Sequence, residues 1–153
     1  MLWNKGVISI SNKPPYYIKT VRRLSLYQEH SRKAIRLQEE IGASGPKTTA
    51  GYSLTPGSSG TSDQVGRLAE KMVDKQEELN QYELEIRIID RLIESLSEAK
   101  GLLIRLRYIE DNKDRYVMHV LIKNGVKVKS ERSFYAMKDE AILDLAKAFG
   151  YVE

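Results

Sequence analysis

The side chains whose types and spacing could do chemistry are concentrated in residues 130–149. Ser130 is a suitable helix N-cap, because its hydroxyl can accept a hydrogen bond from a free backbone N–H of the first turn. Arg132, Tyr135 and Lys138 lie away from a stripe of apolar residues at three- and four-residue spacing, namely Phe134, Met137, Ala141, Leu145 and Ala148. A helix that buries one face and presents Arg, Tyr and Lys on the other suits the major groove of DNA. The alternative is an ordinary packing helix with a solvated charged face.

Five side chains of this predicted helix are expected to face the groove: Arg132, Ser133, Tyr135, Ala136 and Lys138. Arg132 has the reach for a bidentate contact with guanine, and Lys138 is placed to meet a phosphate. Tyr135 has an alternative role as a half-buried support beside Phe134. Contacts to the phosphate backbone, which add affinity but no sequence choice, are expected from four further cations: Arg115, Lys123, Lys127 and Lys129.

The chain offers little for catalysis or for metal binding. It has no cysteine, which excludes disulfides and thiolate sites, and its only histidines are His30 and His119. His119 follows Met118 in a short predicted helix, where we expect a structural role and not a general base. The carboxylates of residues 74–94 have the spacing of coiled-coil flanks. We therefore expect no enzyme, no bound metal and no cofactor.

Charge is unevenly distributed along the 153 residues, whose formal net charge is +4. Residues 1–41 carry eight bases against three acids, and residues 115–138 carry six bases against Glu131 alone. Residues 63–98, between these regions, are acidic. A uniformly solvated surface does not require two basic regions flanking an acidic helix, and the pattern is compatible with an anionic partner.

Two long helices are predicted ahead of the C-terminal region, over residues 18–41 and 64–96. The second carries an apolar seam across more than four heptads, interrupted only by Lys75, which favours a coiled coil. Its expected inward positions are Val65, Leu68, Met72, Leu79, Tyr82, Ile86, Ile89, Ile93 and Leu96. The Gly-, Ser- and Thr-rich residues 42–63 are predicted to be a flexible loop. The two helices can pair as an antiparallel hairpin within the chain or between two subunits, and the sequence allows both.

Three shorter helices are predicted after this seam, at residues 98–109, 115–122 and 130–149. Ser95 and Glu98 have the spacing of a capping box ahead of the first, and Gly125 is suited to end the second in a left-handed conformation. Three short helices with a glycine in the last connection form the layout of a helix-turn-helix. The connection over residues 123–129 is longer than usual, so either the middle helix is displaced or part of the connection extends as a wing.

Four short segments within residues 102–150 carry a family resemblance: Leu106-Arg107-Tyr108-Ile109-Glu110, Ser130-Glu131-Arg132-Ser133-Phe134-Tyr135, Lys138-Asp139-Glu140-Ala141 and Leu145-Ala146. In these segments the chain resembles phage transcriptional regulators of the ArpU/RinA type, which are related to region four of bacterial sigma factors. The resemblance implies a small DNA-binding regulator of late or lysis-associated genes in a prophage of a Gram-positive host.

Together these features predict an all-α protein in two parts. Residues 1–96 are expected to form a long helical hairpin or coiled coil that oligomerises, as a dimer, and residues 97–153 a three-helix helix-turn-helix domain that binds double-stranded DNA. The expected function is sequence-specific regulation of phage or prophage transcription. No apolar run is long enough to span a membrane, and the cytoplasm of the bacterial host cell is the expected location.

Two other functions stay open at this point. A small terminase subunit for DNA packaging also joins a helix-turn-helix to an oligomerising helical hairpin, although usually with the DNA-binding part first. A coiled-coil adaptor that contacts RNA polymerase through the acidic helix is the third possibility.

Overall fold

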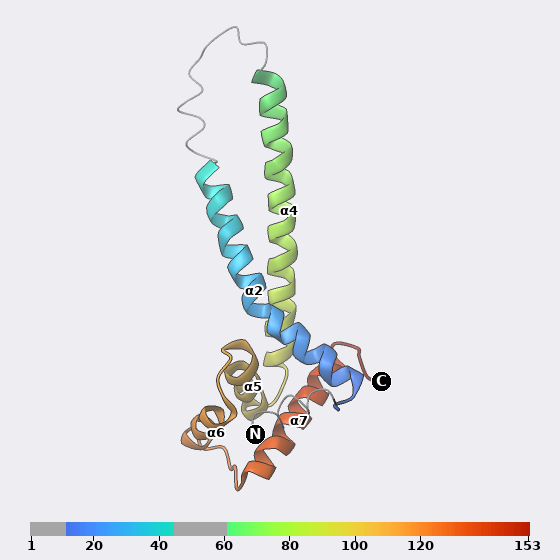
Figure 1. Cartoon of the computed structure of the whole chain (residues 1–153), viewed down its shortest axis with the longest axis vertical. Coiled ribbons are helices and arrows are strands. Elements are labelled where there is room, and N and C mark those ends of the chain that lie inside the picture. The colour runs from blue at the N-terminus through green and yellow to red at the C-terminus, as the bar shows by residue number, and fades with distance from the viewer. Residues whose placement is uncertain (1–11, 45–60) are drawn as a thin grey trace. The chain divides into compact units, whose positions relative to one another are not determined.

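The computed structural model describes residues 12–44 and 61–153, and every regular element in these ranges is a helix (Figure 1). The elements are α2 (Pro15–Ser44), α4 (Thr61–Glu94), α5 (Glu98–Ile104), the π-helix η1 (Arg105–Ile109), α6 (Asp114–Lys123) and α7 (Glu131–Ala148). The prediction of an all-α chain with two long helices ahead of shorter ones is confirmed. Of the predicted loop 42–63, both ends are helical, and the rest lies outside the described residues. None of the described helices has a stretch long and apolar enough to cross a membrane.

The chain divides into two compact units. The first, which we call the core unit, comprises Met1–Gln28 and Ile88–Glu153, and the second, the helix-pair unit, comprises Glu29–Arg87. This division differs from a single boundary between residues 96 and 97, because the first part of α2 and the last part of α4 belong with the shorter helices. The physical reason is the hydrophobic core, which draws side chains from all of these segments.

The core of the core unit combines residues far apart in sequence. Leu24 of α2 and both Ile89 and Ile93 of α4 are buried in the same cluster as side chains from the C-terminal helices, which include Leu103, Ile104, Val117, Leu121, Phe134, Ile142 and Leu145. Fully burying a side chain of this size stabilises a fold by about 1.5–3 kcal/mol. The predicted inward stripe of α7 is buried at Phe134 and further along the helix, but Ala148 at its end is exposed.

Local signals set the ends of the short helices. The Ser130 hydroxyl caps α7 by accepting from the Ser133 N–H, at 3.2 Å. Gly125 follows α6 with φ 85°, and the next N–H, that of Val126, donates to the Leu121 carbonyl at 3.0 Å, which is the Schellman arrangement. The cap of α5 differs from the prediction, because Ser97 and not Ser95 accepts from the first turn.

Within the helix-pair unit, the described parts of α2 and α4 pack against each other in antiparallel directions (Figure 1). Ala34 and Leu37 of α2 cluster with Leu79 of α4, and further along α2, Glu40 pairs with Lys75 at 3.4 Å. The chain therefore pairs its own long helices, one of the two arrangements that the sequence allowed. At the start of α4, however, Val65 and Leu68 of the predicted seam are 45% and 51% exposed.

Replacing Leu24 tests whether α2 belongs to the core unit. Leu24→Ala should lower the free energy of unfolding by about 2–5 kcal/mol, because it leaves a cavity at a fully buried position. The matched control is Leu26→Ala, two residues along the same helix, where the side chain is 42% exposed and the loss should stay below about 1 kcal/mol. Urea unfolding followed by circular dichroism measures both, and equal losses would contradict this assignment.

Candidate nucleic-acid interface

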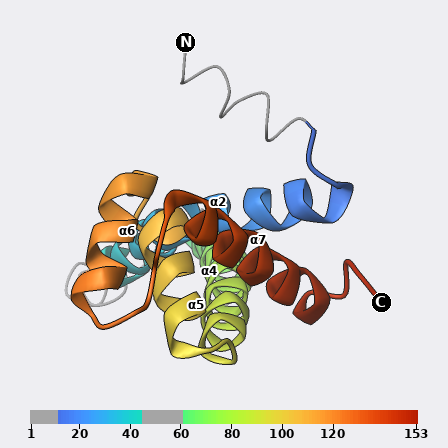
Figure 2. The same ribbon diagram turned by 90° about the horizontal axis from the view of Figure 1, so that it is seen from below.

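The connection between α6 and α7 places two lysines at the surface. Residues 126–129 form neither helix nor turn, and burial alternates along them. Val126 and Val128 are half-buried against the core, whereas Lys127 and Lys129 are exposed. Because successive side chains of an extended segment point in opposite directions, this short stretch packs its valines inward and presents its lysines outward. Figure 2 follows the connection from α6 to the start of α7.

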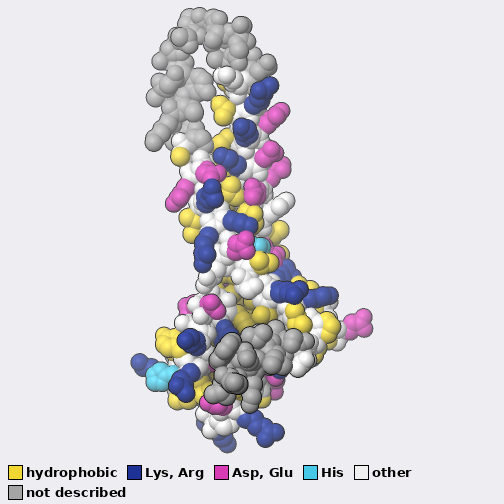
Figure 3. All heavy atoms as spheres, in the orientation of Figure 1, with side chains coloured by type: hydrophobic (Ala, Val, Ile, Leu, Met, Phe, Trp, Pro, Cys, Tyr) yellow, Lys and Arg dark blue, Asp and Glu magenta, His cyan; other side chains and the backbone are white. Residues whose placement is uncertain are grey.

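Five of the predicted DNA-binding residues are exposed cations on α6, the connection and the first turn of α7: Arg115, Lys123, Lys127, Lys129 and Arg132. None of them forms an ion pair with another described residue. Figure 3 shows Lys and Arg side chains over α6 and over the start of α7. We call these five residues the cationic surface.

Several other cations of the core unit have acidic partners within the chain. Lys100 of α5 lies 2.7 Å from Asp144 of α7, and Arg105 of η1 lies 3.2 Å from Asp90 of α4. The contrast matters because an ion pair within the chain already satisfies a cation, whereas an exposed unpaired cation is available to an anionic partner.

At the start of α7, some of the predicted groove-facing residues are exposed and others are engaged within the chain. Arg132 and Ala136 are exposed, and Tyr135 is 46% exposed. Ser133 is half-buried, and its hydroxyl is engaged in the capping box, where it accepts from the Ser130 N–H at 3.0 Å and donates to the Ser130 carbonyl at 2.8 Å. The hydroxyl of Ser133 therefore serves the helix end, which the sequence interpretation missed.

Lys138, predicted to contact a phosphate, is held inside the core unit. Its ammonium lies 3.2 Å from Asp114, and its side chain is only 13% exposed. Burial lowers the pKa of Lys138, and the negative charge of Asp114 opposes that effect. A contact between Lys138 and DNA would therefore require this ion pair to open.

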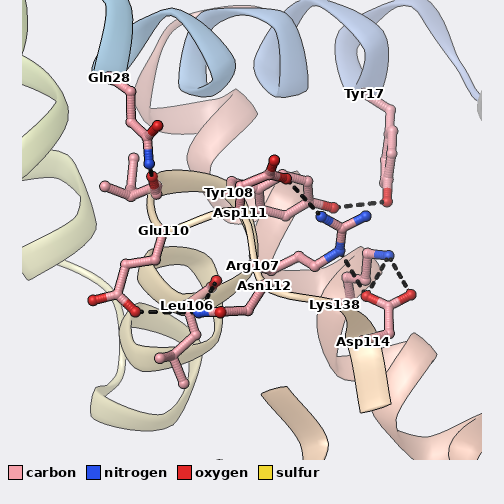
Figure 4. A network of polar contacts seen from close by, with 11 residues as sticks. Tyr17, Gln28, Leu106, Arg107, Tyr108, Glu110, Asp111, Asn112, Asp114 and Lys138 are labelled. Carbon is pink, nitrogen blue, oxygen red and sulfur yellow. Dashed lines mark hydrogen bonds and ion pairs between the residues drawn. The ribbon is translucent and has the colours of Figure 1, made fainter. Parts of the chain in front are cut away.

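Asp114 is the centre of a polar network that joins three elements (Figure 4). As the first residue of α6, it accepts from Arg107 Nε of η1 at 2.7 Å and from Lys138 Nζ of α7. Its carboxylate also lies at the positive end of the α6 dipole. Asp114 directly precedes the predicted helix over residues 115–122, and nothing in local spacing pairs it with residues 107 and 138.

The π-helix η1 supplies the remaining contacts of this network. The sequence predicted a plain α-helix over residues 98–109, but the Glu110 N–H donates to the carbonyl of Arg105, five residues back, at 2.8 Å. Such a wide turn is often associated with functional sites. Here the Tyr108 hydroxyl lies 3.4 Å from that of Tyr17, and the Ile109 carbonyl accepts from the side chain of Gln28 (Figure 4). Through these contacts α2 is bound to the same turn that holds Asp114.

The comparisons with known proteins give no independent indication of function. No protein-family model matches the chain, and neither the curated proteins nor the solved structures contain a significant match. Within the described ranges, no three His, Asp or Glu side chains come together as a metal site. The resemblance to ArpU/RinA-type regulators thus stays a prediction.

Substitution of Asp114 tests the network. Asp114→Asn removes the carboxylate closest to Arg107 and Lys138, and should lower the free energy of unfolding by about 1–3 kcal/mol. Asp111→Asn is the matched control, because Asp111 also lies near Arg107, at 3.7 Å, but its side chain is 86% exposed. We expect a change of less than about 0.5 kcal/mol there. Similar losses of unfolding free energy in the two variants would mean that the ion pairs of Asp114 do not stabilise the fold.

Alkaline unfolding tests the environment of Tyr108. Burial, and secondarily the neighbouring Tyr17, raises the pKa of the Tyr108 phenol above its ordinary value of 10.0. Above that pH the unfolded chain loses this proton while the folded chain keeps it, so stability falls as the pH rises. Between pH 8 and pH 11 the wild type should lose about 1.4 kcal/mol more than Tyr108→Phe, which has no proton to lose. Urea unfolding at both pH values measures the difference. Equal losses of unfolding free energy in the wild type and Tyr108→Phe would show that burial does not raise the pKa of Tyr108.

Proposed function

We propose that this chain binds double-stranded DNA through α6, α7 and their connection, and that it regulates transcription. The observation that carries the proposal is the cationic surface, whose five members, exposed and unpaired among the described residues, are gathered on α6, the connection and the first turn of α7. Cations that neutralise phosphates release bound counterions, which is the main source of affinity for DNA. A surface of this kind is expected to bind DNA of any sequence with a strong dependence on salt.

We assign recognition of the DNA base sequence to the first two turns of α7. Arg132 has the length for two hydrogen bonds to guanine, and Ala136 can contact a thymine methyl group. The later part of the helix suits DNA less well, because Asp139 and Glu140 are exposed there. In a helix-turn-helix the second helix enters the major groove with its N-terminal residues while the first helix crosses the backbone. Arg115 and Lys123 of α6 fit that second role.

The partners follow from the same scheme. We propose a dimer through the long helices, which would place two half-sites about one duplex turn apart, roughly 34 Å. Because residues of this chain resemble the ArpU/RinA type, we propose that the regulated genes are late or lysis-associated genes of a prophage. The proposed location is the cytoplasm of a bacterial host. RNA polymerase is a further proposed partner, through the acidic residues of α4.

Selection of bound duplexes from a random pool, at two salt concentrations, tests the proposal. Enrichment of a two-part site, with affinity that falls steeply as salt rises, is the expected result. Binding without enrichment, together with a ring-shaped oligomer, would favour a packaging protein over a regulator. No binding at low salt would contradict DNA binding and leave a protein-binding adaptor.

Substitution of Arg132 and Lys129 separates base reading from backbone contact. Arg132→Ala should cost about 1–3 kcal/mol on the selected site and relax its base preference. Lys129→Ala should weaken binding to all sequences alike and reduce the salt slope by about 0.9. The control is Lys147→Ala, an exposed cation in the last turn of α7, which should change neither quantity. Fluorescence anisotropy measures all three variants, and an equal loss on selected and random DNA for Arg132→Ala would remove its base-reading role.

A further inference from the structure

The exposed face of α6 carries a row of three basic side chains. Arg115, His119 and Lys123 follow one another at four-residue spacing, and all three are exposed. Four residues of an α-helix advance about 6 Å, so the row runs along the helix with its members roughly one turn apart. On the opposite face, Val117 and Leu121 are fully buried in the core. Packing of α6 therefore fixes which way the row points.

The surroundings of His119 contain no acidic partner. Its neighbours along the exposed face are Arg115 and Lys123, with Tyr116 and Ile122 flanking them, 53% and 51% exposed. In the described part of the chain no carboxylate pairs with the imidazole.

Several charged groups on the elements packed against α6 are paired within the chain, whereas Glu98 of α5 and both Glu131 and Arg132 of α7 are exposed and form no ion pair with another described residue. Arg107 of η1 and Lys138 of α7 are both held by Asp114 at the start of α6. On α5, Lys100 pairs with Asp144. The row on α6 is thus cationic at both ends, with a titratable group in the middle.

We propose that His119 is a contact to a DNA phosphate that depends on a proton, in the middle of the row that α6 presents to the backbone. This inference rests on the proposed function, in which the first helix of the helix-turn-helix crosses the phosphate backbone. A phosphate backbone that meets both Arg115 and Lys123 passes within reach of the side chain between them. The negative oxygen favours the protonated imidazole, because opposite charges attract over such a distance. Binding of DNA then takes up a proton.

The consequence is that DNA affinity rises as the pH falls through the range in which imidazoles gain a proton, between about pH 8 and pH 5. Each phosphate that is neutralised adds about 0.9 to the slope of log affinity against log salt. The salt slope should therefore be steeper at low pH by about that amount. Lysine and arginine side chains keep their charge over this range, so they contribute no pH dependence of this kind.

The test is the affinity of the full chain for one duplex of random sequence, measured by fluorescence anisotropy at pH 8 and pH 5.5. An exposed ion pair is worth about 0.2–1 kcal/mol, so the wild type should bind roughly 1.4- to fivefold more tightly at pH 5.5. His119→Gln should remove most of this difference. His119→Lys should bind at both pH values about as tightly as the wild type at pH 5.5. The exposed position makes both substitutions compatible with folding, which circular dichroism checks.

The chain supplies its own matched control, because its only other histidine is His30. His30 lies in the helix-pair unit, and His30→Gln should keep the full pH response. A pH response that persists in His119→Gln, or DNA binding without any pH response, would overturn this inference and leave the proposed function standing. Absence of DNA binding at both pH values would overturn the proposed function itself.

Discussion

The arrangement of the C-terminal helices depends on one carboxylate, that of Asp114, which holds cations from two other elements. Arg107 reaches it from η1 at 2.7 Å and Lys138 reaches it from α7 at 3.2 Å. Because Asp114 begins α6, the same charge stabilises the positive end of that helix. Three elements are thereby fixed against one another, and their relative directions determine where Arg132 and the lysines of the connection lie.

Two groups of cations in the core unit differ in their surroundings. Those within the network, such as Lys138, are shielded from water and paired with acids, where removing the partner leaves an uncompensated charge. Those of the cationic surface are exposed and have no acidic partner among the described residues. The first group positions helices, and the second is available to an anion. The gathering of five exposed cations on adjoining elements is why this group supports the functional proposal.

Local patterns predicted the helices and some of their ends, since apolar spacing and capping depend on neighbouring residues. Ser130 and Gly125 have the predicted roles, and Phe134 is buried as expected. The contacts that the sequence did not predict join residues far apart in the chain. No local signal links Gln28 with Ile109 or Lys138 with Asp114. The π-helix η1 and the division of the chain into two units also involve such contacts between distant residues. The DNA contacts stay a prediction, because exposure shows that a side chain is available without identifying its ligand.

The most direct test of DNA binding by α6 and α7 is to map where DNA touches the chain. Backbone amide signals of the full-length protein would be followed by nuclear magnetic resonance as a duplex of random sequence is added at low salt. DNA binding by the C-terminal helices predicts shifts along α6, the connecting residues 124–130 and the first two turns of α7, with the helix-pair unit unaffected. Shifts confined to the helix-pair unit, or none anywhere, would contradict it.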